Sequence, residues 1–146
     1  MLVSHAPLFA VPDALAAVVV AGVLVLVFSL LKEPVRQQFM AIFVGGAGGA
    51  YLSGGLGGWE FAFASLMLYV AYRGLRSYTF IGVGWLLHTA WDAVHHFYGN
   101  PIVPFVPTSS GQCAICDPLF ALWLFYQAPS VYPYLRRKFR PTNQPT

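Results

Sequence analysis

The sequence predicts an all-α fold, namely a polytopic membrane helix bundle. Two observations lead to this prediction. Of the 146 residues, 58% are apolar and only 9% are charged, with a mean hydropathy of +0.63, whereas a soluble domain carries about 25% charged residues. The apolar residues also form separate runs near the length of about 20 residues that crosses a bilayer. This composition excludes a cytoplasmic globular enzyme, a disordered tail and a nucleic-acid-binding domain, because too much apolar surface would face water.

Five spans are expected within one domain, residues 1–146. The first run is preceded by no basic residue and followed by Lys32-Glu33-Pro34 instead of a small-residue cleavage site, so we expect a permanent helix and not a cleaved signal peptide. In the fifth span, Asp117 is expected to cap the helix and Pro118 to occupy its first turn. The expected spans are 12–31, 37–56, 59–74, 78–98 and 117–134, with an outer loop at 99–116.

The basic residues predict the orientation. With five spans, all eight fall in the first connection, the third connection or the C-terminal tail, which lie on one side of the membrane. Because basic residues stay on the cytoplasmic side, the N-terminus is expected outside and the C-terminus inside. We interpret the connection 32–36 as an orientation signal and a turn, not as a site. The basic residues are Lys32, Arg36, Arg73, Arg76, Arg136, Arg137, Lys138 and Arg140.

A polar stripe on the fourth span is the strongest candidate site. His88, Asp92, His95 and His96 share one helix face, and ionisable groups within a membrane face the bundle interior or a water-filled cavity. Imidazole and carboxylate are ligands for zinc, iron or copper. A neighbouring helix must complete the shell, and Glu60, Asp117 and the two cysteines are the candidates. Two alternatives stay open: Asp92 orients a ligating histidine, or the histidines only pack.

The second motif, Cys113-Ala-Ile-Cys116, is expected just before the fifth helix, where the helix dipole favours thiolates. Its predicted outer location is oxidising, so a disulfide would persist there. Three roles remain open: a structural disulfide, metal ligation together with His95 or His96, and redox catalysis.

The third motif is a pair of small-residue stripes along the second span. Residues four apart share a helix face, and stripes of this kind allow two helices to approach closely. The predicted role is helix packing inside the bundle, in a homo-oligomer or in a larger membrane complex. A groove for a lipid tail, quinone or pigment is the alternative. The stripe residues are Gly45, Gly49 and Ser53 on one face, and Gly46 and Gly54 on the other.

Two of these motifs resemble parts of known enzymes. The segment Asp92-Ala-Val-His95-His96 is similar to a His-x-x-His-His box of membrane fatty-acid desaturases and hydroxylases, with Asp92 in place of the first histidine. Those enzymes carry several such boxes, and this chain has four histidines in all. The cysteine motif is similar to that of quinone-coupled thiol oxidases of the vitamin K epoxide reductase kind, without their relay cysteine pair.

As a whole, the chain resembles an uncharacterised family of small bacterial multi-pass membrane proteins. The segments that carry the resemblance are Lys32-Glu33-Pro34, the glycine-rich second span and residues 85–118. The resemblance implies a bacterial inner membrane location and no established activity. Three functions therefore stay open: a metal- or cofactor-binding membrane protein, a non-catalytic subunit of a larger complex, and a quinone-linked thiol–disulfide oxidoreductase. Whether the protein is an enzyme is undecided by the sequence.

Overall fold

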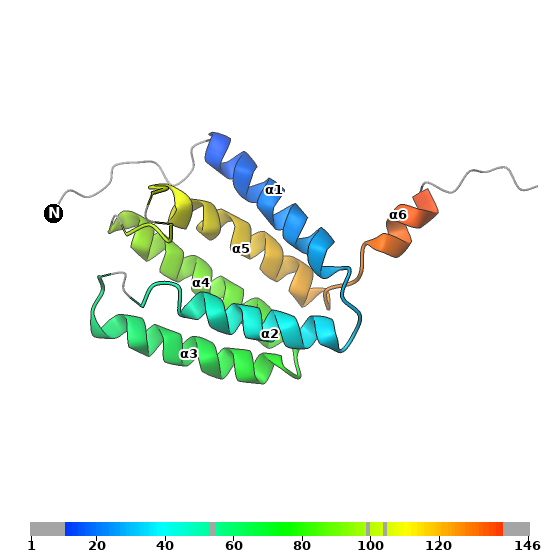
Figure 1. Cartoon of the computed structure of the whole chain (residues 1–146), viewed down its shortest axis with the longest axis horizontal. Helices are drawn as coiled ribbons and strands as arrows, with labels where there is room; N and C mark the ends of the chain where they lie inside the picture. Colours follow the sequence, from blue (N-terminus) through cyan, green and yellow to red (C-terminus); the bar gives the residue numbers. More distant parts are fainter. Residues whose placement is uncertain (1–10, 53–54, 99, 104, 139–146) are drawn as a thin grey trace, which may run out of the picture.

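A computed structural model describes residues 11–52, 55–98, 100–103 and 105–138 of the chain. Within these residues the protein is all-helical, as predicted, with six helices and no strand (Figure 1). The helices are α1 (Val11–Phe28), α2 (Val35–Gly48), α3 (Gly58–Gly74), α4 (Tyr78–Phe97), α5 (Ser109–Phe125) and α6 (Tyr132–Lys138).

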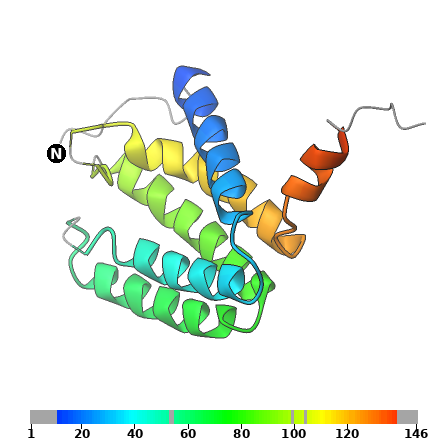
Figure 2. The ribbon, with the colours of Figure 1, turned by 45° about the vertical axis from the view of Figure 1, so that its right-hand side comes forward.

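Helix α4 lies in the middle of the bundle. It packs against α5 on one side and against α2 and α3 on the other, while α1 packs on α5 (Figures 1 and 2). The short helix α6 stands apart from the other five (Figure 2). Because neighbours surround α4, the histidine and aspartate side chains on that helix are buried in the bundle.

The fifth helix differs most from the sequence prediction. It begins at Ser109 and ends at Phe125, so the expected start at 117, the expected end at 134 and the outer loop to 116 are wrong. Pro118 lies inside the helix. The helix starts early because its first turn is anchored on α1: the Gln112 amide donates to the Asp13 carboxylate at 2.7 Å, and the Thr108 hydroxyl donates to the same oxygen at 3.1 Å.

The second helix is shorter than expected, since it ends at Gly48 and not near 56. Each glycine in a helix costs about 1 kcal/mol relative to alanine, and the sequence from 45 to 58 is rich in glycine. The chain leaves the helix there and turns through 49–52. This early end places Tyr51 in the interior of the bundle, where it is 3% exposed.

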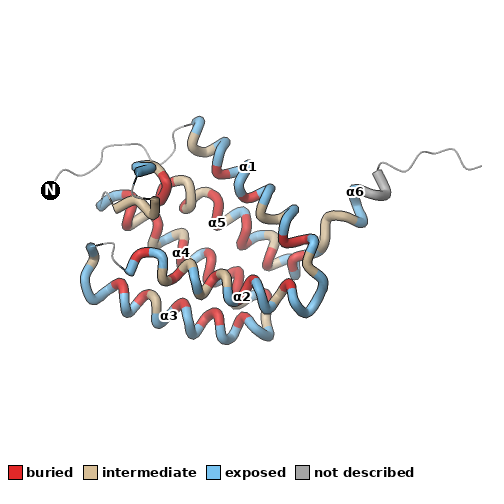
Figure 3. Tube along the Cα trace, viewed as in Figure 1, coloured by how far each residue is buried: buried red, intermediate tan, exposed pale blue. Residues whose placement is uncertain are grey.

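The bundle has a largely apolar exterior and a partly polar interior. Figure 3 shows that exposed and buried positions alternate along each of the long helices. Large apolar side chains are exposed along α1, and also on α2 and α3, where Ile42 and Leu68 are examples. The interior contains an apolar core built around Met40, Met67 and Phe120, and beside it a set of buried polar side chains. By length and hydropathy, α1 is the one helix among the described residues that qualifies as a membrane span.

The end of the bundle that carries the α1–α2 connection is held together by Arg36, which is only 7% exposed. Its guanidinium donates twice to the Leu31 carbonyl, at 2.9 and 2.6 Å, and once to the Ala128 carbonyl at 2.6 Å. The Glu33 carboxylate lies 3.3 Å from the Arg36 guanidinium. The same carboxylate accepts a hydrogen bond from the Tyr78 hydroxyl at 2.7 Å. Arg36 therefore ties the α1–α2 connection to the end of α5, which is more than the orientation signal inferred from the sequence.

The end of α5 explains why Arg36 is needed there. Gln127 and Ala128 both have positive φ, at 64° and 44°, a conformation that helix ends usually give to glycine. Neither residue is glycine, so this backbone is unfavourable by itself. The hydrogen bond from Arg36 holds the Ala128 carbonyl in place, and the turn stops α5 well short of residue 134.

Of the predicted stripe residues, Gly45 lies against α3, where an added Cβ would be 3.0 Å from the Ala71 Cβ. Gly46 faces open space, and Gly49 is the residue that caps α2, beside atoms of its own turn. Ser53 and Gly54 lie outside the described residues. The closest approach is made by Gly48, where an added Cβ would clash with the Met67 side chain.

We expect Gly48→Ala to destabilise the protein by about 1–3 kcal/mol, because the added methyl group overpacks the α2–α3 contact. Gly46→Ala is the matched control on the same helix. It should be neutral or stabilising by up to about 1 kcal/mol, because alanine favours the helix and nothing lies within 4 Å of the new atom. Thermal unfolding of both variants checks this, and equal melting temperatures would contradict the packing described for α2 and α3.

Candidate metal centre

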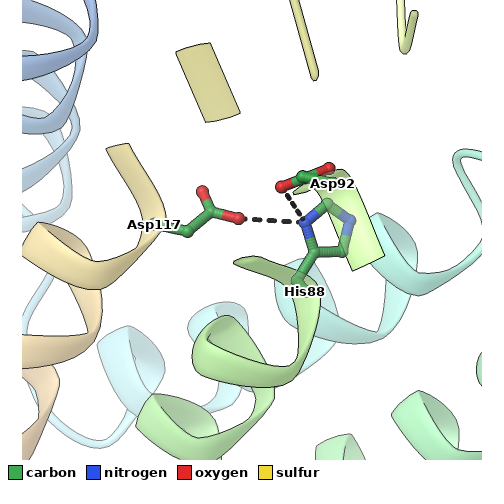
Figure 4. Close-up of side chains that lie close together, drawn as sticks. All are labelled: His88, Asp92 and Asp117. Atoms are coloured by element: carbon green, nitrogen blue, oxygen red, sulfur yellow. Dashed lines mark hydrogen bonds and ion pairs between the residues drawn. The ribbon is translucent and has the colours of Figure 1, made fainter. Parts of the chain in front are cut away.

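Three buried side chains from α4 and α5 converge at the centre of the bundle (Figure 4). The His88 Nδ1 atom lies 2.9 Å from an oxygen of Asp92 and 2.9 Å from an oxygen of Asp117. One potential ligand atom from each of the three residues lies within 4.8 Å of the other two. His88, Asp92 and Asp117 are 2%, 0% and 5% exposed. We call this group the His88 cluster.

The helices position these three groups in two ways. His88 and Asp92 are one helical turn apart on α4, so they share a face. Asp117 comes from α5, the helix in closest contact with α4, and its location inside that helix, instead of at its N-terminus, turns its carboxylate toward His88.

The other ring nitrogen of His88 fixes the tautomer. Its Nε2 atom lies 3.0 Å from the carbonyl oxygen of Ala47, in the last turn of α2. A carbonyl only accepts, so Nε2 must carry a proton and donate it. In a neutral ring, Nδ1 then carries no proton, and its lone pair faces both carboxylates. Backbone carbonyls often orient metal-binding histidines in this way.

The negative charge of the His88 cluster can be neutralised in two ways. Two carboxylates and a neutral imidazole carry a charge of about −2, which a buried site cannot hold without a partner. A divalent cation neutralises this charge completely. Without a cation, protons must be taken up, and a protonated His88 would donate from Nδ1 to the carboxylates. Separations of 2.9 Å are hydrogen-bond distances, and they are close to the spacing of about 3 Å around an octahedral ion. A tetrahedral zinc ion would need its ligand atoms about 3.3 Å apart.

Tyr51 connects the His88 cluster to the first turn of α5 and to the α4–α5 connection. Its hydroxyl lies 2.7 Å from the second oxygen of Asp92 and 2.7 Å from the Ser110 hydroxyl. Ser110 in turn accepts a hydrogen bond from the Ile102 amide at 3.0 Å. Both oxygens of Asp92 therefore have partners, and the carboxylate is fixed in orientation.

The predicted ligands Glu60, His95 and His96 lie outside the His88 cluster. His95 is fully buried, with its Nε2 atom 3.3 Å from the Glu60 carboxylate and its ring stacked on Tyr51 at 3.8 Å. Glu60 also accepts a hydrogen bond from the Leu56 amide. His96 lies against the start of α5, where an added Cβ at Gly111 would be 3.0 Å from its ring. The stripe predicted on α4 is thus divided, with Tyr51 between its two parts.

Cys113 and Cys116 are free thiols inside α5. Their expected location before the helix is wrong because α5 begins earlier, and inside the helix they lack the free N–H groups of an N-terminus that would favour thiolates. Both line a cavity of about 290 Å³, together with His88 and Asp117. The two thiols therefore lie beside the His88 cluster without joining it.

Sequence reasoning named Asp117 only as one of several candidates for completing the shell, and it did not find Tyr51 or the Ala47 carbonyl. Tyr51 had one available signal, since it is the sole aromatic residue between Gly45 and Gly58. A single phenol among small residues indicates a side chain with a specific partner. The Ala47 carbonyl has no sequence signal, because it depends on where α2 ends.

The chain was compared with known proteins. The model of a family described as a family of unknown function (DUF6010) matches residues 12–130. Neither the curated proteins nor the solved structures include a match to the chain. The family match covers all five long helices and confirms the prediction of an uncharacterised family with no established activity.

Proposed function

The chain belongs to this family of unknown function, DUF6010, and we propose that it is a multi-pass membrane protein that binds one divalent transition-metal ion at His88, Asp92 and Asp117. The observation that carries the proposal is the convergence of two buried carboxylates, from Asp92 and Asp117, on His88, whose tautomer is set by a backbone carbonyl.

The distribution of side chains supports a membrane location. Exposed aliphatic and aromatic residues cover α1 and much of α2 and α3, while the ionisable groups of the His88 cluster are inside. In a bilayer, apolar side chains face lipid and polar ones face the bundle interior. At 1.5 Å per residue, the 20 residues of α4 span about 30 Å, the thickness of the hydrocarbon core.

Helix α2, with 14 residues, is about 21 Å long and too short to cross alone. The chain continues beyond it as an irregular turn that includes Tyr51, which is buried among α4 and α5. Non-helical backbone is tolerated at membrane depth where protein surrounds it. The short helix is therefore compatible with five crossings, the N-terminus outside and the C-terminus inside.

A reporter fused after Arg140 should be active only in the cytoplasm of a bacterial host, and one inserted at Pro107, between α4 and α5, only outside. The reason is the location of Lys32, Arg36, Arg73 and Arg76, which lie in or next to the α1–α2 and α3–α4 connections, at one end of the bundle in Figure 1. Reporter activity on the same side for both fusions would mean that α5 does not cross the membrane and would contradict the five-span topology.

The donor set supports zinc or iron as the metal. Imidazole is a ligand for zinc, iron and copper, whereas the two carboxylates are harder oxygen ligands and the soft thiols do not contribute. Three protein ligands leave a coordination position open, which is typical of catalytic sites and not of structural ones. His88 and Asp117 both line the 290 Å³ cavity, so we place the open position on that side.

Metal analysis of the purified, full-length protein tests the proposal. We expect about one equivalent of zinc or iron per chain after extraction in a mild detergent and dialysis. A folded protein that contains no metal, and that takes up none when zinc or iron(II) is added, would contradict the proposal and leave the His88 cluster as a protonated packing group.

A further inference from the structure

A cavity with a positively charged wall lies at the α3–α4 connection, at the same end of the bundle as the α1–α2 connection (Figure 1). Its volume of about 410 Å³ is in the range of small-molecule sites. Arg73, Arg76 and Ser77 line it, and none of the described residues that line it is acidic. Neither arginine forms an ion pair within the described part of the chain. The cavity therefore presents two positive charges without a negative partner.

A tight turn fixes the spacing of these residues. The Arg76 amide donates to the Arg73 carbonyl at 3.2 Å. The Ser77 amide donates to the Gly74 carbonyl at 3.1 Å. Gly74 in turn lies so close to α4 that an added Cβ would be 2.7 Å from the Ile81 side chain. The turn is thus packed against α4, and the backbones of the two arginines are held in a fixed relation.

The side chains around the cavity offer hydrogen-bond donors that the protein itself does not use. The Arg73 guanidinium lies over the Phe80 ring, 4.4 Å from its centre, and donates to the Tyr69 hydroxyl at 3.0 Å. A guanidinium carries several N–H donors, so others on Arg73 stay available. Arg76 is exposed, and the Ser77 hydroxyl makes no hydrogen bond that caps α4. Planar guanidinium groups match the oxygens of a phosphate in both charge and geometry.

An exposed apolar face of α3 leads away from the cavity. Tyr72 lines the cavity and is exposed, and Leu68 and Phe61 are exposed on the same face of the helix. For the membrane location proposed above, this face contacts lipid chains, and the cavity lies at the depth of the headgroups. A lipid would occupy both the cavity and the face, whereas a free phosphate ion would leave the face unused.

We propose that this cavity, the Arg73 pocket, binds the phosphate headgroup of an anionic lipid, with Arg73 and Arg76 on the phosphate oxygens and an acyl chain along the exposed face of α3. The proposed topology places this end in the cytoplasmic leaflet, which has a negative surface potential. A headgroup that carries an ammonium would bring a cation to two arginines, and like charges placed together are unfavourable. The proposal rests on the membrane location in the proposed function, and it does not depend on the metal.

The test is native mass spectrometry of the full-length protein in detergent, titrated with phosphatidylglycerol, phosphatidylcholine or inorganic phosphate. We expect one phosphatidylglycerol to bind at least about tenfold more tightly than phosphatidylcholine, because each of two basic side chains contributes about fivefold near an anionic lipid. Equal binding of the two lipids would overturn the proposal. Binding of inorganic phosphate as tight as that of phosphatidylglycerol would also overturn it, because the ligand would then be the free ion.

Three variants locate the lipid. Arg73→Gln and Arg76→Gln should each weaken the binding of phosphatidylglycerol about fivefold and leave that of phosphatidylcholine unchanged. Lys32→Gln is the matched control, since it removes one positive charge at the same end of the bundle but lines a different cavity. It should leave the tight site unchanged. An equal loss in all three variants would indicate attraction to the overall charge and would overturn the pocket, and so would undiminished binding in both arginine variants.

Membrane extraction of the same protein separates this proposal from the proposed function. A protein that alkaline carbonate releases from membranes without detergent would contradict the membrane location, and the lipid pocket with it. A protein that needs detergent for its release but binds both lipids equally would contradict only the Arg73 pocket. Metal content is independent of either result.

Discussion

The His88→Ala variant is expected to lose its bound metal, with an affinity for zinc or iron at least about 100-fold lower than that of the wild type. The change removes the only nitrogen ligand and also the contact that holds it on the Ala47 carbonyl. Loss of a residue that only orients a ligand costs about 10–100-fold, so loss of the ligand itself should exceed that range. Metal titration of the purified protein, followed by mass spectrometry, measures the effect.

His95→Ala is the matched control on the same helix. It removes a histidine of equal burial that pairs with Glu60 and not with the His88 cluster, so the metal content should stay close to that of the wild type. The reverse result, with metal kept in His88→Ala and lost in His95→Ala, would place the site at Glu60 and His95 instead.

Arg36→Met is expected to destabilise the fold by about 3 kcal/mol or more. Methionine keeps much of the buried length but removes every donor, so the Leu31 and Ala128 carbonyls lose charged hydrogen-bond partners, each worth about 1.5–3 kcal/mol. The backbone of Ala128, which has a positive φ, also loses the hydrogen bond that stabilises its conformation. Thermal unfolding in detergent should show a clearly lower melting temperature.

Arg73→Met provides the comparison for this prediction. Arg73 is exposed and lies over the Phe80 ring at 4.4 Å, with a hydrogen bond to Tyr69. Exposed contacts of this kind contribute about 1 kcal/mol or less. A melting temperature for Arg36→Met that equals that of Arg73→Met would show that the α1–α2 connection does not depend on Arg36.

The fold was predictable wherever a long apolar run determines a helix. The fourth helix was expected at 78–98 and is observed at Tyr78–Phe97, because its apolar and aromatic residues recur, between the residues of the polar stripe, up to Gly99-Asn100-Pro101. The pairing of His88 with Asp92 was equally accessible, since it needs only the helical repeat. These local features do not depend on other parts of the chain.

Features that depend on distant contacts were not predictable. Asp117 and Pro118 look like a helix start, but the contacts of Asp13 with Thr108 and Gln112 begin α5 earlier. That shift moves Asp117 into the helix and toward His88. The division of the polar stripe likewise depends on Tyr51, which reaches Asp92 across 41 residues of sequence. The sequence marks Tyr51 as unusual among small residues, but it does not identify Asp92 as its partner or Asp13 as the partner of Thr108 and Gln112.

The central claim, a metal ion held by His88, Asp92 and Asp117, is tested most directly by X-ray absorption at the metal edge of the loaded protein. The structure predicts one imidazole and otherwise oxygen ligands, with nitrogen and oxygen scatterers at about 2.0–2.2 Å for zinc. A sulfur scatterer at about 2.3 Å would bring Cys113 or Cys116 into the shell. That result, or a second imidazole from His95 or His96, would contradict this account of the site.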